Sequence, residues 1–171
     1  MAFFGGLRYN LIHDIVNLYL QVRKIRRLQM KNLTIINALA YANKYYDEKG
    51  LRHALRVADY VGQDDLIVAK YKNDAVVLAI MHDLIEDTKF MDENQDILSD
   101  DIMYALDLLT KPADMNYDDY CKRIRSAAGD KVFGYLAYRV KIADMKDHLM
   151  QTETLTEKLK AKYLSGLRYL L

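Results

Sequence analysis

Residues 74–88 read Asp-Ala-Val-Val-Leu-Ala-Ile-Met-His-Asp-Leu-Ile-Glu-Asp-Thr. Every position from Ala75 to Met81 is apolar, so a helix formed here is hydrophobic on all sides. Such a helix is stable only when other elements surround it. We therefore predict that this segment is the buried centre of the fold.

Four ionisable residues follow this apolar run. His82 and Glu86 are one helical turn apart, as are Asp83 and Asp87, so a helix would gather all four side chains in one polar patch. Three carboxylates near a helix C-terminus oppose the helix dipole, and burying them is unfavourable unless a cation neutralises their charge. A divalent metal ion would supply that cation.

The composition of the chain favours an all-α protein. Its 171 residues are 51% hydrophobic, which suits a single domain with a sizeable core. With 7 glycines and 1 proline, the chain has few of the residues that form tight turns between strands. The one cysteine, Cys121, excludes an internal disulfide framework and suits the reducing cytoplasm, where we expect the protein to act.

Charge and hydropathy indicate neither a nucleic-acid-binding protein nor a membrane protein. A formal net charge of +1 gives no overall attraction to either partner, so no specific nucleic acid is predicted. The apolar residues near the start of the chain are interrupted by His13, Asp14 and Asn17, a pattern that fits neither a signal peptide nor a membrane span.

The sequence predicts an additional N-terminal amphipathic helix over residues 7–29. Its apolar face consists of Leu11, Ile15, Leu18, Val22 and Ile25. Basic residues at its end favour a helix C-terminus electrostatically, and they are Arg23, Lys24, Arg26, Arg27 and Lys31. Self-association through this helix and phosphate binding remain open alternatives. We treat residues 1–32 as a helical arm and residues 33–171 as the folded domain.

Apolar periodicity predicts further helices on both sides of the central one. They span residues 33–46, 51–61, 64–71, 100–109, 117–127 and 131–149, followed by a C-terminal helix. Ile36 and Leu55 are expected on the buried faces of the first two. Residues 89–95 are polar and are predicted to form a loop.

Several polar residues have the positions expected of helix N-caps. The expected caps are Asn32 or Thr34, Asn73 for the central helix, Ser99, Asn116, and a capping box at Thr154-x-x-Glu157 for the last helix. The last helix is expected to pack through Leu155, Leu159, Tyr163, Leu167 and Leu170.

His53, the His82-Asp83 pair and Asp144 fall on three separate predicted helices, which a bundle could bring to one point. Asp144 continues an apolar helix face and therefore needs a partner for its charge. Mixed imidazole and carboxylate ligands suit Mn, Fe, Zn or Co better than Mg or Ca. In the alternative, purely structural interpretation, His53 is a satisfied core histidine and the carboxylates pair with Lys or Arg.

The order His, then His-Asp, then Asp resembles the motif of the HD-domain metal-dependent phosphohydrolases. Within that superfamily, residues 33–149 are most similar to the hydrolase domain of the RelA/SpoT-type alarmone enzymes and their small stand-alone homologues. The matching segments are Ala-Leu-Ala-Tyr-Ala at 38–42, His-Ala-Leu-Arg-Val-Ala at 53–58, Leu-Thr at 109–110, Tyr-Asp-Asp-Tyr at 117–120 and Lys-Ile-Ala-Asp at 141–144. His-Asp-Leu-Ile-Glu-Asp-Thr at 82–88 is the most specific of them.

This resemblance implies a compact HD-domain helical bundle and a hydrolase. The ligands that it implies for one divalent metal, typically Mn²⁺ with Fe, Co, Zn or Mg as other candidates, are His53, His82, Asp83 and Asp144. It also implies that Glu86 and Asp87 position and deprotonate the attacking water, because a carboxylate one turn from the metal can accept the proton. The implied reaction is hydrolysis of a nucleotide phosphoester, and in the closest branch it is removal of the 3′-pyrophosphate from guanosine-3′,5′-bis(diphosphate), (p)ppGpp.

Basic residues near the matching segments are candidates to bind substrate phosphates. On charge and approximate placement they are Lys111, Lys122, Arg123 and Lys141, with a solvated basic face as the alternative. His148 stands where the resemblance leads us to expect asparagine. It could donate a hydrogen bond to the substrate, add a metal ligand or alter the chemistry.

Two further departures from the family pattern leave other functions open. The segment Tyr45–Gly50 is short and lacks the Arg that helps to hold guanine, and His53 is followed by Ala54 instead of proline. A 5′-nucleotidase or nucleoside-triphosphate hydrolase is therefore the first alternative. A non-catalytic nucleotide-binding sensor is the second, although the intact Glu86 and Asp87 favour catalysis.

Overall fold

The structure is a computed structural model and describes residues 13, 17–18, 21, 33–94 and 97–171. These residues form α-helices and one 3₁₀ helix, with no strand among them, so the prediction of an all-α fold is confirmed. Most of the predicted N-terminal arm lies outside the described residues. In the part of the chain that the structure describes, no helix has the length and apolar character needed to cross a bilayer.

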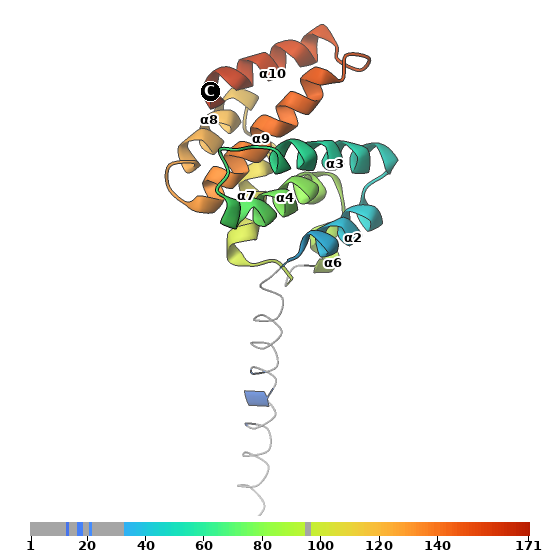
Figure 1. Ribbon diagram of the computed structural model, residues 1–171, viewed down its shortest axis with the longest axis vertical. Helices are drawn as coiled ribbons and strands as arrows, with labels where there is room; N and C mark the ends of the chain where they lie inside the picture. The colour runs from blue at the N-terminus through green and yellow to red at the C-terminus, as the bar shows by residue number, and fades with distance from the viewer. Residues whose placement is uncertain (1–12, 14–16, 19–20, 22–32, 95–96) are drawn as a thin grey trace, which may run out of the picture.

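Helix α4 (Lys72–Met81) is the buried centre of the bundle, as its sequence predicts. Its apolar residues Ala75, Val77, Leu78, Ala79, Ile80 and Met81 are all nearly inaccessible to solvent. Four helices surround it (Figure 1): α2 (Ile35–Tyr45), α3 (Glu48–Gly62), α7 (Asp100–Leu109) and α9 (Val132–Met150). Burial on every side explains why this helix tolerates no polar face.

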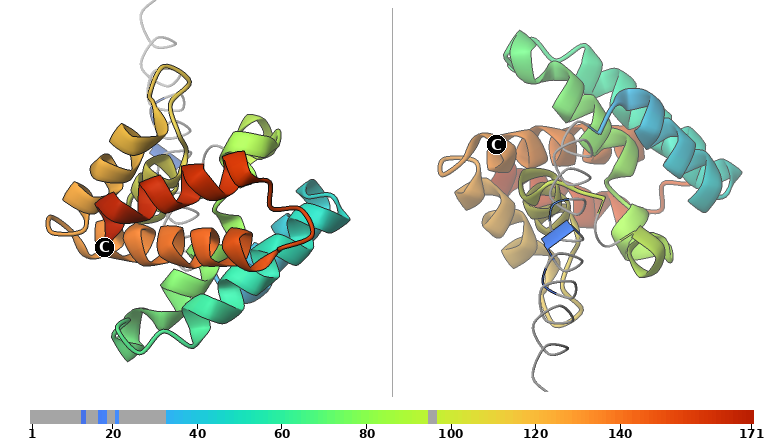
Figure 2. Two further views of the ribbon diagram at one scale, coloured as in Figure 1. Left: turned by 90° about the horizontal axis from the view of Figure 1, so that it is seen from above. Right: turned by 90° about the horizontal axis from the view of Figure 1, so that it is seen from below.

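Helix α9 belongs to two hydrophobic cores at once. Leu136, Ala137 and Val140 pack into the main core with α4 and α7. Met145 packs into a second core with α8 (Tyr117–Ala127) and α10 (Glu157–Leu170). Figure 2 shows α10 lying along α9 on the side away from α3. The predicted packing residues Leu155, Leu159, Tyr163, Leu167 and Leu170 all take part in this second core.

The polar end of the central segment is not one continuous helix. Helix α4 ends at Met81, the chain turns at His82 and Asp83, and a short helix, α5 (Leu84–Asp87), follows. Adjacent residues of an unbroken helix point about 100° apart. His82 keeps helical dihedral angles, with φ −58° and ψ −35°, and the chain departs from the helix at Asp83, with φ −98° and ψ −2°. With this backbone, Nε2 of His82 and Oδ2 of Asp83 lie 3.1 Å apart.

The prediction of a loop over residues 89–95 is wrong, because helix α6 (Phe90–Asn94) forms there. Phe90 is completely buried and packs edge-on against the rings of Tyr41 and Tyr45. The Asn94 amide donates to the Phe90 carbonyl at 2.9 Å. A single buried residue, Phe90, in a polar segment produces no apolar periodicity, so the sequence pattern did not predict this helix.

Helix starts were predicted well where a cap precedes a regular apolar stripe. Thr34, Ser99 and Asn116 are observed N-caps. Asn73 is not an N-cap, because α4 already begins at Lys72, directly after a 3₁₀ turn at Ala69–Tyr71. This turn is the only helical part of the segment 64–71, where the sequence predicts a helix. The box at Thr154 is also wrong, since α10 begins at Glu157 and Thr156 caps it.

Two apolar residues expected in the core lie at the surface instead. Ile36 is 78% exposed and Leu55 is 43% exposed. Their helices bury small side chains in their place, namely Ala38 and Ala42 on α2 and Ala54 on α3. Small residues at these contacts allow the helices to approach closely.

We expect Gly134→Ala to destabilise the protein. A Cβ at this position of α9 would lie 2.2 Å from the backbone oxygen of Ala127 at the end of α8, so the two helices would have to separate. Overpacking of this kind lowers the free energy of unfolding by roughly 1–3 kcal/mol, measurable from urea midpoints. Gly62→Ala is the control, because nothing lies within 4 Å of its Cβ. Equal effects of the two substitutions would contradict the predicted clash.

Candidate metal centre

Three helical segments bring the four predicted metal ligands to one point. His53 comes from α3, His82 and Asp83 from the turn after α4, and Asp144 from α9. The Nε2 atom of His53 lies 3.2 Å from Nε2 of His82 and 3.2 Å from Oδ1 of Asp144. The Nε2 atom of His82 lies 3.1 Å from Oδ2 of Asp83. Residues that are far apart in the sequence therefore form one cluster.

Asp144 is the member of the cluster whose charge most needs a cation. It is 3% exposed, and its Oδ2 accepts a hydrogen bond from Lys141 at 2.7 Å. Its Oδ1 is buried and completes no hydrogen bond with any described residue, although the Nε2 atoms of His53 and His148 lie 3.2 and 3.1 Å away. A buried carboxylate oxygen without a partner is unfavourable, and a metal ion at this point would satisfy it.

Hydrogen bonds on the far side of each imidazole direct Nε2 into the cluster. The Nδ1 atom of His82 lies 2.8 Å from the carbonyl oxygen of Ala79, one turn earlier in α4. The Nδ1 atom of His53 lies 2.7 Å from Oδ2 of Asp147. Metal-binding histidines are oriented in this way, because the partner at one nitrogen fixes the tautomer and leaves the other free to bind.

Asp147 is a residue of the centre that the sequence interpretation missed. It is completely buried and receives two hydrogen bonds from Arg56, at 2.7 and 2.9 Å, in addition to its contact with His53. The signal was present in the sequence, because Asp147 follows Asp144 by three residues and so lies on a neighbouring part of the same helix face. The guanidinium compensates the charge that supports His53.

The pKa values show how strongly the cluster attracts positive charge. Burial alone lowers the pKa of His82, but Asp83 and Asp144 outweigh burial and raise it to about 9. For His53 the carboxylates of Asp144 and Asp147 likewise overcome burial and raise the pKa. The pKa of Asp144 is held well below its usual value against burial, mainly by Lys141 and then by the histidines. Protons thus take the positive role that a metal ion would otherwise supply.

Several of the measured separations suit ligands of a shared divalent ion. Ligand atoms about 2.1 Å from a single ion lie about 3–4 Å apart. The Nε2 atom of His53 lies 3.7 Å from Oδ2 of Asp83, and Nε2 of His82 lies 3.8 Å from Oδ1 of Asp144. Both distances fall in this range, as do the distances of 3.1 and 3.2 Å given above for the cluster. Two overlapping groups could hold an ion, one formed by His53, His82 and Asp83 and the other by His53, Asp144 and His148.

The predicted acidic pair lies beside the cluster on α5. Glu86 and Asp87 are exposed, and the backbone N–H of Lys111 donates to Glu86 Oε2 at 3.2 Å. Partial burial, followed by the charges of Asp83 and Glu86, raises the pKa of Asp87. A carboxylate with a raised pKa is a better proton acceptor, so the chemistry of Asp87 suits a general base.

The four basic residues assigned to substrate phosphates are engaged within the protein. The Lys111 ammonium donates to the carbonyl oxygens of Pro112 and Met115. On α8, Lys122 pairs with Asp119 at 2.8 Å and Arg123 pairs with Asp107. Lys141 is 12% exposed and binds Asp144. Only Lys141 therefore touches the metal cluster, and phosphate binding by these residues stays a prediction.

No protein-family model matches this chain, and no curated protein is significantly similar to it.

We expect the stability of EDTA-treated protein to fall as the pH rises from about 6.5 to 9. The pKa of His82 is raised from 6.5 to about 9, so the folded protein holds the proton more tightly than the unfolded chain. Protonated His82 therefore contributes its full share to the free energy of unfolding below pH 6.5, and this contribution is lost as the pH rises through about 9. Urea unfolding should show a loss on the order of 1–3 kcal/mol. A rise in stability over this range would contradict the assignment.

We expect Asp147→Asn to weaken Mn²⁺ binding by about 10–100-fold, because loss of the carboxylate behind a metal-binding histidine has this effect. Isothermal titration calorimetry at constant pH measures the change. Asp107→Asn is the matched control, since it removes a carboxylate that is 68% exposed and pairs with Arg123 at the surface. Unchanged affinity in Asp147→Asn would show that His53 does not bind the ion.

Proposed function

We propose that the protein is a metal-dependent phosphohydrolase that acts on nucleotides. One observation carries this proposal: two imidazoles and two carboxylates converge around a buried oxygen of Asp144 that lacks a hydrogen-bond partner, next to an exposed pair of carboxylates. Lys141 satisfies one oxygen of Asp144, and the imidazole nitrogens of His53 and His148 face the other. Unprotonated imidazole nitrogens are metal ligands, so the groups around this oxygen suit a metal ion.

The two parts of the site have different roles in the proposed reaction. A divalent ion held by the cluster would lower the pKa of a coordinated water and offset charge on a phosphoryl oxygen. Glu86 and Asp87 orient the attacking water, and a carboxylate oxygen of Asp87 accepts its proton. Exposure of both carboxylates leaves room for a substrate beside them.

The preferred substrate is (p)ppGpp, and it rests on the resemblance to alarmone hydrolases. In that reaction one water is consumed, the phosphoester bond at the 3′ oxygen breaks, and GDP or GTP is released with pyrophosphate. The ordered motif and the acidic pair Glu86-Asp87 support this assignment. A cytoplasmic location and self-association through the N-terminal helix stay predictions.

The connection between α2 and α3 favours a second candidate, a 5′-nucleotidase or nucleoside-triphosphate hydrolase. Only Tyr46 and Asp47 join these helices, so the guanine-holding loop of the alarmone hydrolases is reduced to a tight turn. The cations nearby are engaged, Lys44 with Glu93 and Arg52 with Glu48. The base of the substrate would then be bound by other parts of the chain.

We expect Asp87→Asn to lower kcat by about 10²–10⁴-fold while leaving Mn²⁺ affinity within about twofold, because it removes a proton acceptor and no metal ligand. The assay incubates the protein and Mn²⁺ with ppGpp, pppGpp, nucleoside triphosphates and nucleoside monophosphates and separates the products. Glu93→Gln is the control for loss of a surface carboxylate, and Asp83→Ala is the metal-site control.

The products distinguish the candidate functions. Pyrophosphate with GDP or GTP, absent in Asp83→Ala, supports the alarmone hydrolase. Orthophosphate from monophosphates supports the nucleotidase. Nucleotide binding without any product would reject catalysis and support the sensor instead.

A further inference from the structure

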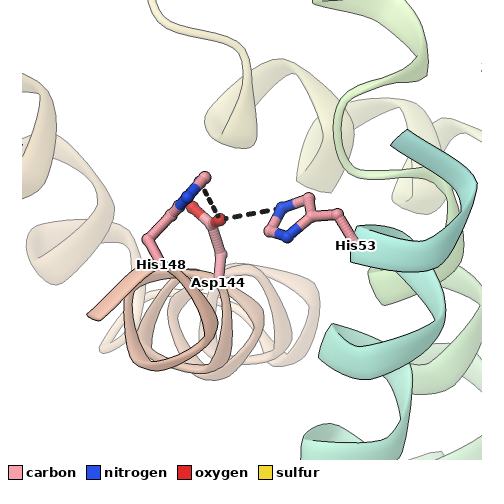
Figure 3. Close-up of side chains that lie close together, drawn as sticks. All are labelled: His53, Asp144 and His148. Carbon is pink, nitrogen blue, oxygen red and sulfur yellow. Dashed lines mark ion pairs between the residues drawn. The ribbon is translucent and has the colours of Figure 1, made fainter. Parts of the chain in front are cut away.

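His148 lies against the metal cluster, on the exposed side of Asp144. Figure 3 shows His148 and Asp144 projecting together from α9 and His53 reaching the same point from α3. The Nε2 atoms of His148 and His53 lie 3.1 and 3.2 Å from Oδ1 of Asp144. Two imidazole nitrogens thus face Oδ1 of Asp144, a buried oxygen that completes no hydrogen bond with the described residues, and the three atoms form a group that could hold a metal ion.

A neighbouring aromatic ring holds His148 in this orientation. Tyr163 of α10 stacks on the imidazole with ring centroids 4.7 Å apart and planes 7° from parallel. The centroid of the imidazole also lies 4.7 Å from the ring centroid of His53, at an interplanar angle of 32°. The His148 side chain is 38% exposed, yet contacts with two elements, α3 and α10, restrict its rotation. A preorganised ring of this kind suits a ligand better than a mobile surface group does.

His148 and His53 both lie within ion-pair distance of Oδ1 of Asp144, whereas the other oxygen of this carboxylate has a different partner. The Lys141 ammonium already binds Oδ2 at 2.7 Å between the rings of Tyr117 and Tyr120. A second positive partner is therefore unnecessary for Asp144, and the atoms that face its free oxygen are two imidazole nitrogens. Lys141 also limits Asp144 to one oxygen as a metal ligand.

From this arrangement we propose that His148 is a fifth protein ligand of the metal ion. This proposal rests on the metal-binding part of the proposed function, and it selects the metal-ligand role among the three alternatives that the sequence leaves open for His148. The five donor atoms are Nε2 of His53, Nε2 of His82, Oδ2 of Asp83, Oδ1 of Asp144 and Nε2 of His148. Three imidazoles with two carboxylates favour Mn, Fe, Co or Zn over Mg and Ca.

A fifth ligand has a consequence for substrate access. A six-coordinate ion with five protein donors keeps one open position, where a site with four would keep two. The centre would then hold a single water or ligand oxygen. Glu86 and Asp87 would have to hold any second oxygen themselves, and their exposure beside the cluster allows this.

The test compares Mn²⁺ binding by the full chain with that of His148→Gln and His148→Asn. Calorimetry gives the affinity, and pulsed electron paramagnetic resonance with ¹⁵N-labelled histidine counts the imidazole nitrogens coupled to the ion. We expect three coupled imidazoles in the wild type, two in either variant, and an affinity lowered at least about tenfold. His13→Gln, which removes an exposed imidazole away from the cluster, should leave both readings unchanged.

Two coupled imidazoles in the wild type, with affinities that agree within twofold, would overturn the proposal. If His148→Asn then also retained turnover, His148 would be a hydrogen-bond donor to the substrate. The measurement needs no substrate, so it separates this inference from the proposed activity. Mn²⁺ bound through three imidazoles in a protein without hydrolase activity would support the fifth ligand and reject the enzyme.

Discussion

Asp144 carries a negative charge into a helical bundle, where the Lys141 ammonium binds one oxygen and the imidazoles of His53 and His148 face the other. Burying this charge is unfavourable unless it is compensated, so the surrounding structure has to supply cations. The protein does so with the buried Lys141 on one side and, on the other, with His53 and His82, whose pKa values the neighbouring carboxylates raise against burial. The candidate site follows from this requirement, because the imidazoles that compensate the carboxylate are also side chains that can bind a metal ion.

Helix α9 can present Asp144 because it lies between two cores. Its first half packs against α4 and α7, and its second half packs against α8 and α10. The carboxylate emerges where these cores meet, and α3 approaches from a third direction with His53 and Arg56. A rigid helix fixed by packing along its whole length holds Asp144, Asp147 and His148 with less freedom than a loop would. The fold thus provides a preorganised set of ligand atoms at the cost of several buried charges.

The sequence predicted the helical class and the proximity of His53, His82, Asp83 and Asp144, whose metal binding stays a prediction, and it predicted local details less well. An uninterrupted apolar run and the ordered motif were sufficient to place α4 at the centre and to choose His53, His82, Asp83 and Asp144. The same patterns failed at Phe90, where one buried ring organises a short helix, and at Leu55, where α3 buries alanine instead of leucine. Apolar periodicity indicates which face of a helix is apolar on average, whereas the burial of Phe90 and the exposure of Leu55 depend on how the neighbouring elements pack.

By itself, the sequence determined that the chain is helical, which segment is buried throughout, and which residue types are available to bind a metal. Those properties depend on composition and on spacing along one helix, which the sequence contains directly. Only the tertiary structure decided that Asp147 and Arg56 support His53, that Lys141 binds Asp144 instead of facing solvent, and that Tyr163 holds His148 beside the cluster. These contacts join residues on different helices or select one direction around a helix, and packing between helices alone fixes them.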